Sequence, residues 1–198
     1  MLSIFLLILY VQEVSAMKPI ISILRSTETS ESNLLENANF DTINGNEIQG
    51  WSAYKDGYDI SEGRNGSKSA YCKSENANSP KGLSQSINLN QKKPIPFLVR
   101  GYSKANDVSG SKDQGYSIYI DLTYQDDTPL WGQTAKFSTG THDWEQQEFM
   151  IYPSKPVKEL TIYGLFRNHT GEVWFDDFEL MELGRDVNVF DTTPIEAK

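Results

Sequence analysis

Two adjacent acidic residues, Asp176 and Asp177, lie within a run of large apolar side chains at residues 171–183. The run alternates between two faces and is rich in aromatic and branched residues, which is typical of a β-strand. A carboxylate in such a strand is costly to bury unless it is paired, hydrogen-bonded or bound to a cation. Calcium takes oxygen ligands, including carboxylates. The pair therefore indicates a buried polar contact or a calcium site.

Aromatic side chains form a second chemical resource, with 10 tyrosines, 9 phenylalanines and 4 tryptophans in 198 residues. Segments 96–104, 116–124 and 159–167 each place a tyrosine opposite an apolar face. Sugar rings stack on aromatic rings, and their hydroxyls hydrogen-bond to planar polar groups. Outward tyrosines that merely favour the pleated conformation are the alternative. The predicted sugar-binding groove consists of Arg100, Tyr102, Tyr119, Asp121, Tyr163 and Arg167.

The globular part of the chain consists of short alternating runs separated by turn-forming pairs such as Asn44-Gly45 and Asn65-Gly66. No segment has a convincing helical period. Many short strands without helices indicate an antiparallel sandwich or barrel. The expected strands are 33–36, 51–54, 69–74, 83–89, 96–104, 116–124, 133–137, 145–152, 159–167 and 172–183.

Three motifs occur in a familiar order: an opening segment at 33–41, the pair Gly50-Trp51, and the closing strand at 171–180. Together they resemble carbohydrate-binding modules of families 4, 9 and 22, over roughly residues 33–183. Members of these families are non-catalytic β-sandwiches that usually hold a structural calcium ion. The resemblance implies an all-β, antiparallel β-sandwich jelly roll that recognises a polysaccharide or glycan.

The same resemblance implies a calcium ion that links the first strand to the last. Its ligands would be Asp41, one of Asp176 and Asp177, and carbonyls of the 65–68 turn or near Asn39; Asp41 stands where the family more often has glutamate. In the family, tryptophans at strand ends often clamp the glycan. Trp51 and Trp131, the latter in an expected loop at 126–132, are therefore further candidates, with a core position as the alternative for Trp51.

Charge and targeting signals limit the possible partners and the cellular location of the protein. The net charge is −9 and the basic residues are scattered, which argues against nucleic acid as a partner. Residues 1–16 carry an apolar run followed by small residues, which predicts a secretory signal peptide and a secreted protein. The run is too short for a membrane span, so we do not expect an integral membrane protein. We expect a linker at 17–32, a domain at 33–183 and a tail or linker at 184–198.

Two sequons predict N-glycosylation at Asn65 and Asn168. No zinc-ligand spacing or nucleophile elbow is present in the sequence, so we expect a non-catalytic domain. Such a domain can be an ancillary part of a larger carbohydrate-active enzyme. One alternative is an extracellular adhesion or matrix glycoprotein that binds protein partners. A second is a lyase-like enzyme on a jelly roll, whose candidates are Arg100, Tyr119, Tyr163 and Arg167.

Overall fold

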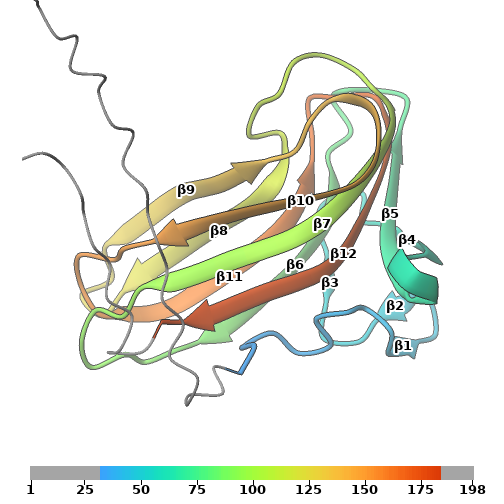
Figure 1. Ribbon diagram of the computed structural model, residues 1–198. Helices are drawn as coiled ribbons and strands as arrows, with labels where there is room; N and C mark the ends of the chain where they lie inside the picture. The colour runs from blue at the N-terminus through green and yellow to red at the C-terminus, as the bar shows by residue number, and fades with distance from the viewer. Residues whose placement is uncertain (1–31, 184–198) are drawn as a thin grey trace, which may run out of the picture. The chain divides into compact units, whose positions relative to one another are not determined.

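The structure is a computed structural model that describes residues 32–183. This part of the chain forms two five-stranded sheets that face each other, and a small pair made of β1 (Ile43–Asn44) and β2 (Glu47–Ile48) (Figure 1). Every strand pairing is antiparallel. The prediction of an all-β, antiparallel sandwich is therefore confirmed.

One sheet, called here the β7 sheet, has the strand order β10 (Gly140–Ile151), β7 (Phe97–Val108), β12 (Gly171–Glu182), β5 (Lys68–Ser74) and β4 (Asp59–Glu62). The other, called the β11 sheet, has the order β3 (Ser52–Ala53), β6 (Lys81–Asn88), β11 (Val157–Phe166), β8 (Tyr116–Tyr124) and β9 (Pro129–Lys136). Consecutive strands from β5 to β8, and again from β10 to β12, alternate between the two sheets. This alternation is the connectivity of a jelly roll.

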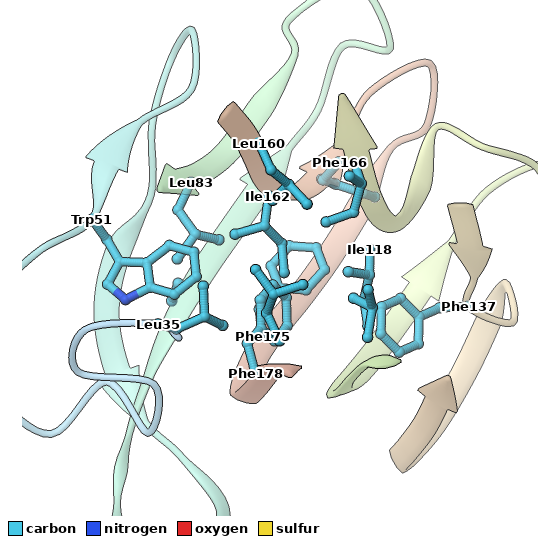
Figure 2. Close-up of a cluster of buried hydrophobic side chains, with 14 of the residues drawn as sticks. Leu35, Trp51, Leu83, Ile118, Phe137, Leu160, Ile162, Phe166, Phe175 and Phe178 are labelled. Atoms are coloured by element: carbon cyan, nitrogen blue, oxygen red, sulfur yellow. The ribbon is translucent and has the colours of Figure 1, made fainter. Parts of the chain in front are cut away.

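The hydrophobic core lies between the sheets because one face of each long strand is apolar. The predicted inward residues of β8 and β11 are all buried. They meet Phe175 and Phe178 of β12, which come from the opposite sheet (Figure 2). The inward side chains of β8 and β11 are Tyr116, Ile118, Ile120, Leu122, Tyr124, Leu160, Ile162 and Phe166.

A β-bulge in β12 corrects one sequence expectation. Strict alternation would place Phe178 and Leu180 on the face opposite Phe175. The register with β7 shifts between Asp176 and Glu179, and Asp177 has a φ of 49°. The extra residue turns the strand so that Phe175, Phe178 and Leu180 are all fully buried.

The opening segment is not the strand that the sequence predicts, although it lies along β12. Asn33 takes the place of a ladder partner: its Nδ2 donates to Phe178 O at 2.9 Å, and its Oδ1 accepts from Leu180 N at 3.0 Å. Leu34 N also donates to Leu180 O at 2.8 Å. The first and last parts of the domain are therefore joined by this asparagine side chain and by backbone bonds, which include Phe178 N to Ala38 O at 2.9 Å. The short strands β1, β2 and β4 were not predicted.

Close packing around Gly101 gives a test of the core. A Cβ at this position would lie 2.4 Å from Cδ1 of Phe178, whose ring is itself enclosed by the core. We expect Gly101→Ala to lower the free energy of unfolding by about 1–3 kcal/mol, because overpacking forces the ring off its site. Urea denaturation measures this loss. An unchanged midpoint would show that the core between β7 and β12 is looser than described.

The expected signal peptide at 1–16, nearly all of the linker at 17–32 and the tail at 184–198 lie outside the described residues. Within residues 32–183, no helix is long and apolar enough to cross a membrane.

Candidate functional site

The residues of the predicted groove are divided between the two sheets. Tyr119 and Tyr163 lie on β8 and β11, whereas Arg100 and Tyr102 lie on β7. The prediction of one groove containing all of them is therefore wrong. The alternation of each strand was read correctly, but the sheet that each strand joins depends on jelly-roll pairing between distant segments.

A row of tyrosines crosses the outer face of the β11 sheet. Tyr163 pairs in register with Tyr119 on β8, and its ring centroid lies 5.8 Å from that of Tyr119. On its other side the Tyr54 ring lies 5.6 Å away, and both contacts are edge-to-face. All three side chains are partly exposed. We call this surface the tyrosine face, which comprises Tyr54, Tyr119, Tyr163, Asp121, Arg167 and Trp131.

Hydrogen-bonding groups accompany the rings. The Arg167 guanidinium carbon lies 5.3 Å from the centroid of the Tyr119 ring, and its buried Nε has no hydrogen-bond partner among the described residues. Asp121 Oδ1 accepts from Gly132 N at 3.0 Å, which fixes the carboxylate beside the rings. Burial raises the pKa of Tyr119 and Tyr163, and the charge of Asp121 raises each further. Both phenols therefore stay neutral at physiological pH.

Trp131 lies at a bulge of β9 rather than in the expected loop. The register between β8 and β9 shifts opposite Asp121, between Ile120 and Leu122. Leu130 packs against the core, so the next side chain, Trp131, points outward and is 70% exposed. The bulge therefore presents an indole at the end of the tyrosine face.

Trp51 belongs to the core, and the prediction that it binds ligand is wrong. It is only 4% exposed, and its ring meets Phe40 at 4.9 Å and Phe178 at 5.8 Å. Its indole Nε1 donates to the carbonyls of Glu36 and Asn37 at 3.2 Å each. The indole thus anchors the opening segment (Figure 2).

Sequence reasoning missed the polar end of this surface. Ser86 Oγ and Thr161 Oγ1 lie 2.8 Å apart on the outer face and share a hydrogen bond. Beside them a shallow pocket of about 510 Å³ is lined in part by Glu36, Ser52 and Ser84. The signal was the outward serines of β6, which alternate with its buried residues. The row of rings therefore continues into hydroxyl and carboxylate groups.

The two adjacent acids of β12 have different surroundings. Asp176 is fully buried; its Oδ2 accepts from Arg64 N at 2.7 Å and Ser67 Oγ at 2.8 Å. Burial raises its pKa to about 6. Asp177 instead forms an ion pair with the Arg64 guanidinium. Asp41 is exposed and accepts from Lys68 N at 2.9 Å, so it contacts the same turn from outside.

Oxygen atoms converge on this turn. A Cβ built on Gly63 would lie 2.4 Å from Asp176 Oδ2, 2.5 Å from Lys68 O and 2.6 Å from Ser67 Oγ. A carboxylate, a carbonyl and a hydroxyl are the donor types that calcium takes. Within residues 32–183, no group of three or more His, Cys, Asp or Glu side chains is placed to share a metal. A cation here would therefore depend on backbone and hydroxyl oxygens beside Asp176.

The two sequon asparagines are both exposed and both have positive φ. Asn65 lies in the short 3₁₀ turn η1 (Arg64–Gly66) with a φ of 52°, and Asn168 follows β11 with a φ of 62°. Their glycosylation stays a prediction.

Comparison with curated proteins gives partial matches. No family model matches the chain. The tRNA nuclease WapA of Bacillus subtilis strain 168 is 37% identical over 102 residues, which is 50% of this chain and 4% of that protein. The tRNA3(Ser)-specific nuclease WapA of Bacillus spizizenii is 31% identical over 160 residues, which is 78% of this chain and 7% of that protein. The chain thus spans less than a tenth of these relatives.

Solved structures share the fold at low sequence identity. The enzymatically active domain of bacteriophage CBA120 tailspike protein 4 has a TM-score of 0.58 at 9% identity, covering 76% of this chain and 21% of that one. The CBM22-1–GH10 modules of Clostridium thermocellum endo-1,4-β-D-xylanase 10B, complexed with xylohexaose, have a TM-score of 0.54 at 14% identity (81% and 30% coverage). A family 16 carbohydrate-binding module has a TM-score of 0.53 at 15% identity (76% and 100% coverage). The chain has the β-sandwich fold found in carbohydrate-binding modules.

Proposed function

We propose that this domain binds a polysaccharide or glycan without catalysis, and that the ligand lies across the tyrosine face. The row of Tyr54, Tyr163 and Tyr119 carries this proposal. The three ring centroids lie 5.6 Å and 5.8 Å apart in sequence along the row, so the rings form a continuous apolar strip, and sugar C–H faces pack on such strips. The Arg167 guanidinium, whose carbon lies 5.3 Å from the centroid of the Tyr119 ring, provides planar donor groups beside the strip. Fold likeness to carbohydrate-binding modules supports the proposal by analogy.

The arrangement favours a ligand that runs perpendicular to the strands. The centroids of Tyr54, Tyr163 and Tyr119 are spaced 5.6 Å and 5.8 Å apart, so the row is long enough for a disaccharide or more. Trp131 marks the β9 end of the path, and the pocket with Glu36 and Ser84 marks the β3 end. We expect modest affinity for each sugar unit, because the surface is shallow and open.

Catalysis is not part of the proposal. Glycoside hydrolysis uses two carboxylates flanking the bond, whereas the two acids along this surface, Asp121 and Glu36, lie toward its β9 and β3 ends. A lyase-like site containing Arg100 is excluded in the predicted form, because Arg100 lies on the β7 sheet. The proposal does not include the tRNA nuclease activity for which the WapA relatives are named. RNA binding needs a basic surface, whereas the net charge of this chain is −9. We propose that the domain acts outside the cell, because residues 1–16 are expected to be a secretory signal peptide.

Affinity electrophoresis of the full chain tests the proposal, in gels containing xylan, β-glucan or mannan, with calcium and with chelator. We expect one of these polymers to retard the protein, and bovine serum albumin to migrate unchanged as the control. Absence of retardation in every gel would contradict glycan binding for these polymers and favour a protein partner.

We also propose a calcium ion at the Arg64–Gly66 turn, held by Asp176 with oxygens of Ser67 and Lys68. The convergence of these oxygens beside Gly63 supports it. Bound calcium would supply positive charge that offsets the cost of the buried carboxylate. Asp41 contacts Lys68 and is retained as a ligand candidate. The proposed ligand set does not include Asp177, because its carboxylate pairs with Arg64.

Calcium is expected to raise the melting temperature by roughly 5–10 °C when its concentration is about 100 times its Kd. Binding at this concentration increases the free energy of unfolding by about 2.7 kcal/mol. Asp176→Asn should abolish the increase, because it removes the charge while keeping the shape of the side chain. Asp177→Asn is the matched control and should keep most of it. Scanning calorimetry with calcium and with chelator measures both. No calcium effect on the thoroughly chelated native chain would contradict the site.

A further inference from the structure

The outer face of the β7 sheet carries a second row of aromatic side chains. Trp174 on β12 pairs in register with Tyr71 on β5 and with Lys104 on β7. The Trp174 ring lies 4.9 Å from that of Tyr71 and 4.7 Å from Lys104 Nζ, which is also 6.0 Å from the Trp144 ring on β10. The row therefore crosses four strands. We call it the tryptophan face, comprising Tyr71, Trp174, Lys104 and Trp144.

A polar pocket of about 470 Å³ adjoins this row. Tyr102 lines it and lies two residues along β7 from Lys104, with regular pairing to β12 between them. Residues two apart on a strand share a face, so the pocket and the tryptophan face open on the same side. A pocket of this volume is in the range that accommodates small ligands.

The charges in the pocket cancel in pairs. Arg64 forms an ion pair with Asp177, and Arg100 Nε lies 2.6 Å from Glu179 Oε2. The Arg64 guanidinium carbon also lies 3.4 Å from the centroid of the Tyr102 ring. The four groups therefore present planar donors and acceptors without net charge. Such a set suits a neutral, hydroxyl-rich ligand better than an anion, whose charge would compete with both carboxylates.

We infer that the tryptophan face and its pocket form a second binding surface for a neutral oligosaccharide. Aromatic rings beside paired hydrogen-bonding groups are the same combination as on the tyrosine face, here on the opposite sheet. The domain would therefore be bivalent and could hold two polysaccharide chains, one on each side. The ligand class rests on the proposed function, but the surface is built from different residues. Bivalent binding to a polymer raises avidity without any new contact.

Variants that silence one face at a time test this inference. Full-length Tyr119→Ala/Tyr163→Ala is run in gels containing xylan, β-glucan or mannan. We expect it to keep part of the retardation, and Trp174→Ala added to this double variant to weaken the residual binding by about 10-fold or more. Trp174→Phe should retain more binding than Trp174→Ala, because it keeps a ring. Tyr152→Ala is the matched control, since Tyr152 is 53% exposed and belongs to neither face.

Light scattering gives a second readout, because a bivalent domain cross-links a soluble polymer. The native chain should increase the scattering of the retarding polysaccharide, and neither single-face variant should. Circular dichroism and melting confirm that each variant is folded.

The outcomes separate the two proposals. Complete loss of retardation in a folded Tyr119→Ala/Tyr163→Ala variant would overturn the second surface and leave the proposed function intact. Retardation that depends on Trp174 alone would support this surface and overturn the assignment to the tyrosine face. If no polymer retards the native chain, both proposals fail.

Discussion

Removing both central rings, as Tyr119→Ala/Tyr163→Ala, is expected to weaken glycan binding at the tyrosine face by roughly 30- to 100-fold. The two rings lie 5.8 Å apart at the centre of the row, so a sugar unit seated there loses both apolar supports. A central aromatic contact is commonly worth more than 1 kcal/mol, and 1.4 kcal/mol corresponds to a tenfold change in affinity. Isothermal titration with an oligosaccharide of the retarding polymer measures the loss.

Matched substitutions separate stacking from folding and from the phenol groups. Tyr163→Phe keeps the ring and should cost only a few-fold. Tyr152→Ala removes an exposed tyrosine elsewhere and should leave the Kd unchanged. Unaltered affinity of the tyrosine-face site in the double alanine variant would contradict its assignment.

Phe175→Ala is expected to lower the free energy of unfolding by about 3–5 kcal/mol, which is the largest effect on stability that we predict. Phe175 is fully buried, and its ring centroid lies about 6 Å from those of Tyr116, Phe137 and Phe178. It therefore joins the two sheets near the middle of the core (Figure 2). Truncation leaves a cavity whose lining cannot collapse completely, since residues from both layers surround it.

Urea denaturation followed by tryptophan fluorescence measures this change. Domains of this size have a total stability of about 5–15 kcal/mol, so the variant should unfold at much lower urea or fail to fold at 37 °C. Phe175→Leu refills part of the space and should recover part of the loss. A cost below about 1 kcal/mol for Phe175→Ala would contradict the described core.

Much of the fold follows from the period of the sequence. In β8 every second residue is apolar, and this pattern correctly gave both the bounds of the strand and its buried face. The same reasoning identified the inward faces of β7 and β11. Local periodicity is sufficient here because each strand buries one face against the opposite sheet. It does not contain the pairing partners, which join segments far apart in the chain.

Three errors have identifiable physical causes. Arg100 and Tyr102 were grouped with Tyr119 and Tyr163 because alternation shows which residues share a face, but not which strands share a sheet. The bulge at Asp177 reversed the expected faces of the second half of β12. The bulged residue is an acid, so the pattern of apolar residues does not reveal the bulge. Trp51 was assigned to ligand binding, although a tryptophan beside a turn is equally suited to fill the core.

The acid pair was recognised from sequence, but the division of roles between its members was not. Asp176 and Asp177 are adjacent, yet one is fully buried against the Arg64–Gly66 turn and the other pairs with an arginine. The difference arises from the turn that covers Asp176, more than a hundred residues earlier in the chain. Tyr54 joins the row only through its ring contact with Tyr163, which the sequence pattern does not show.

Chemical-shift mapping of the ¹⁵N-labelled chain is the most direct test of glycan binding at the tyrosine face. Xylohexaose, or an oligosaccharide of whichever polymer retards the chain, would be titrated into the protein. Glycan binding as proposed predicts that the largest amide shifts fall on β8, β11 and the Trp131 bulge, together with the indole N–H of Trp131. Shifts confined to the loops at the ends of the sandwich, with β8 and β11 unchanged, would contradict it.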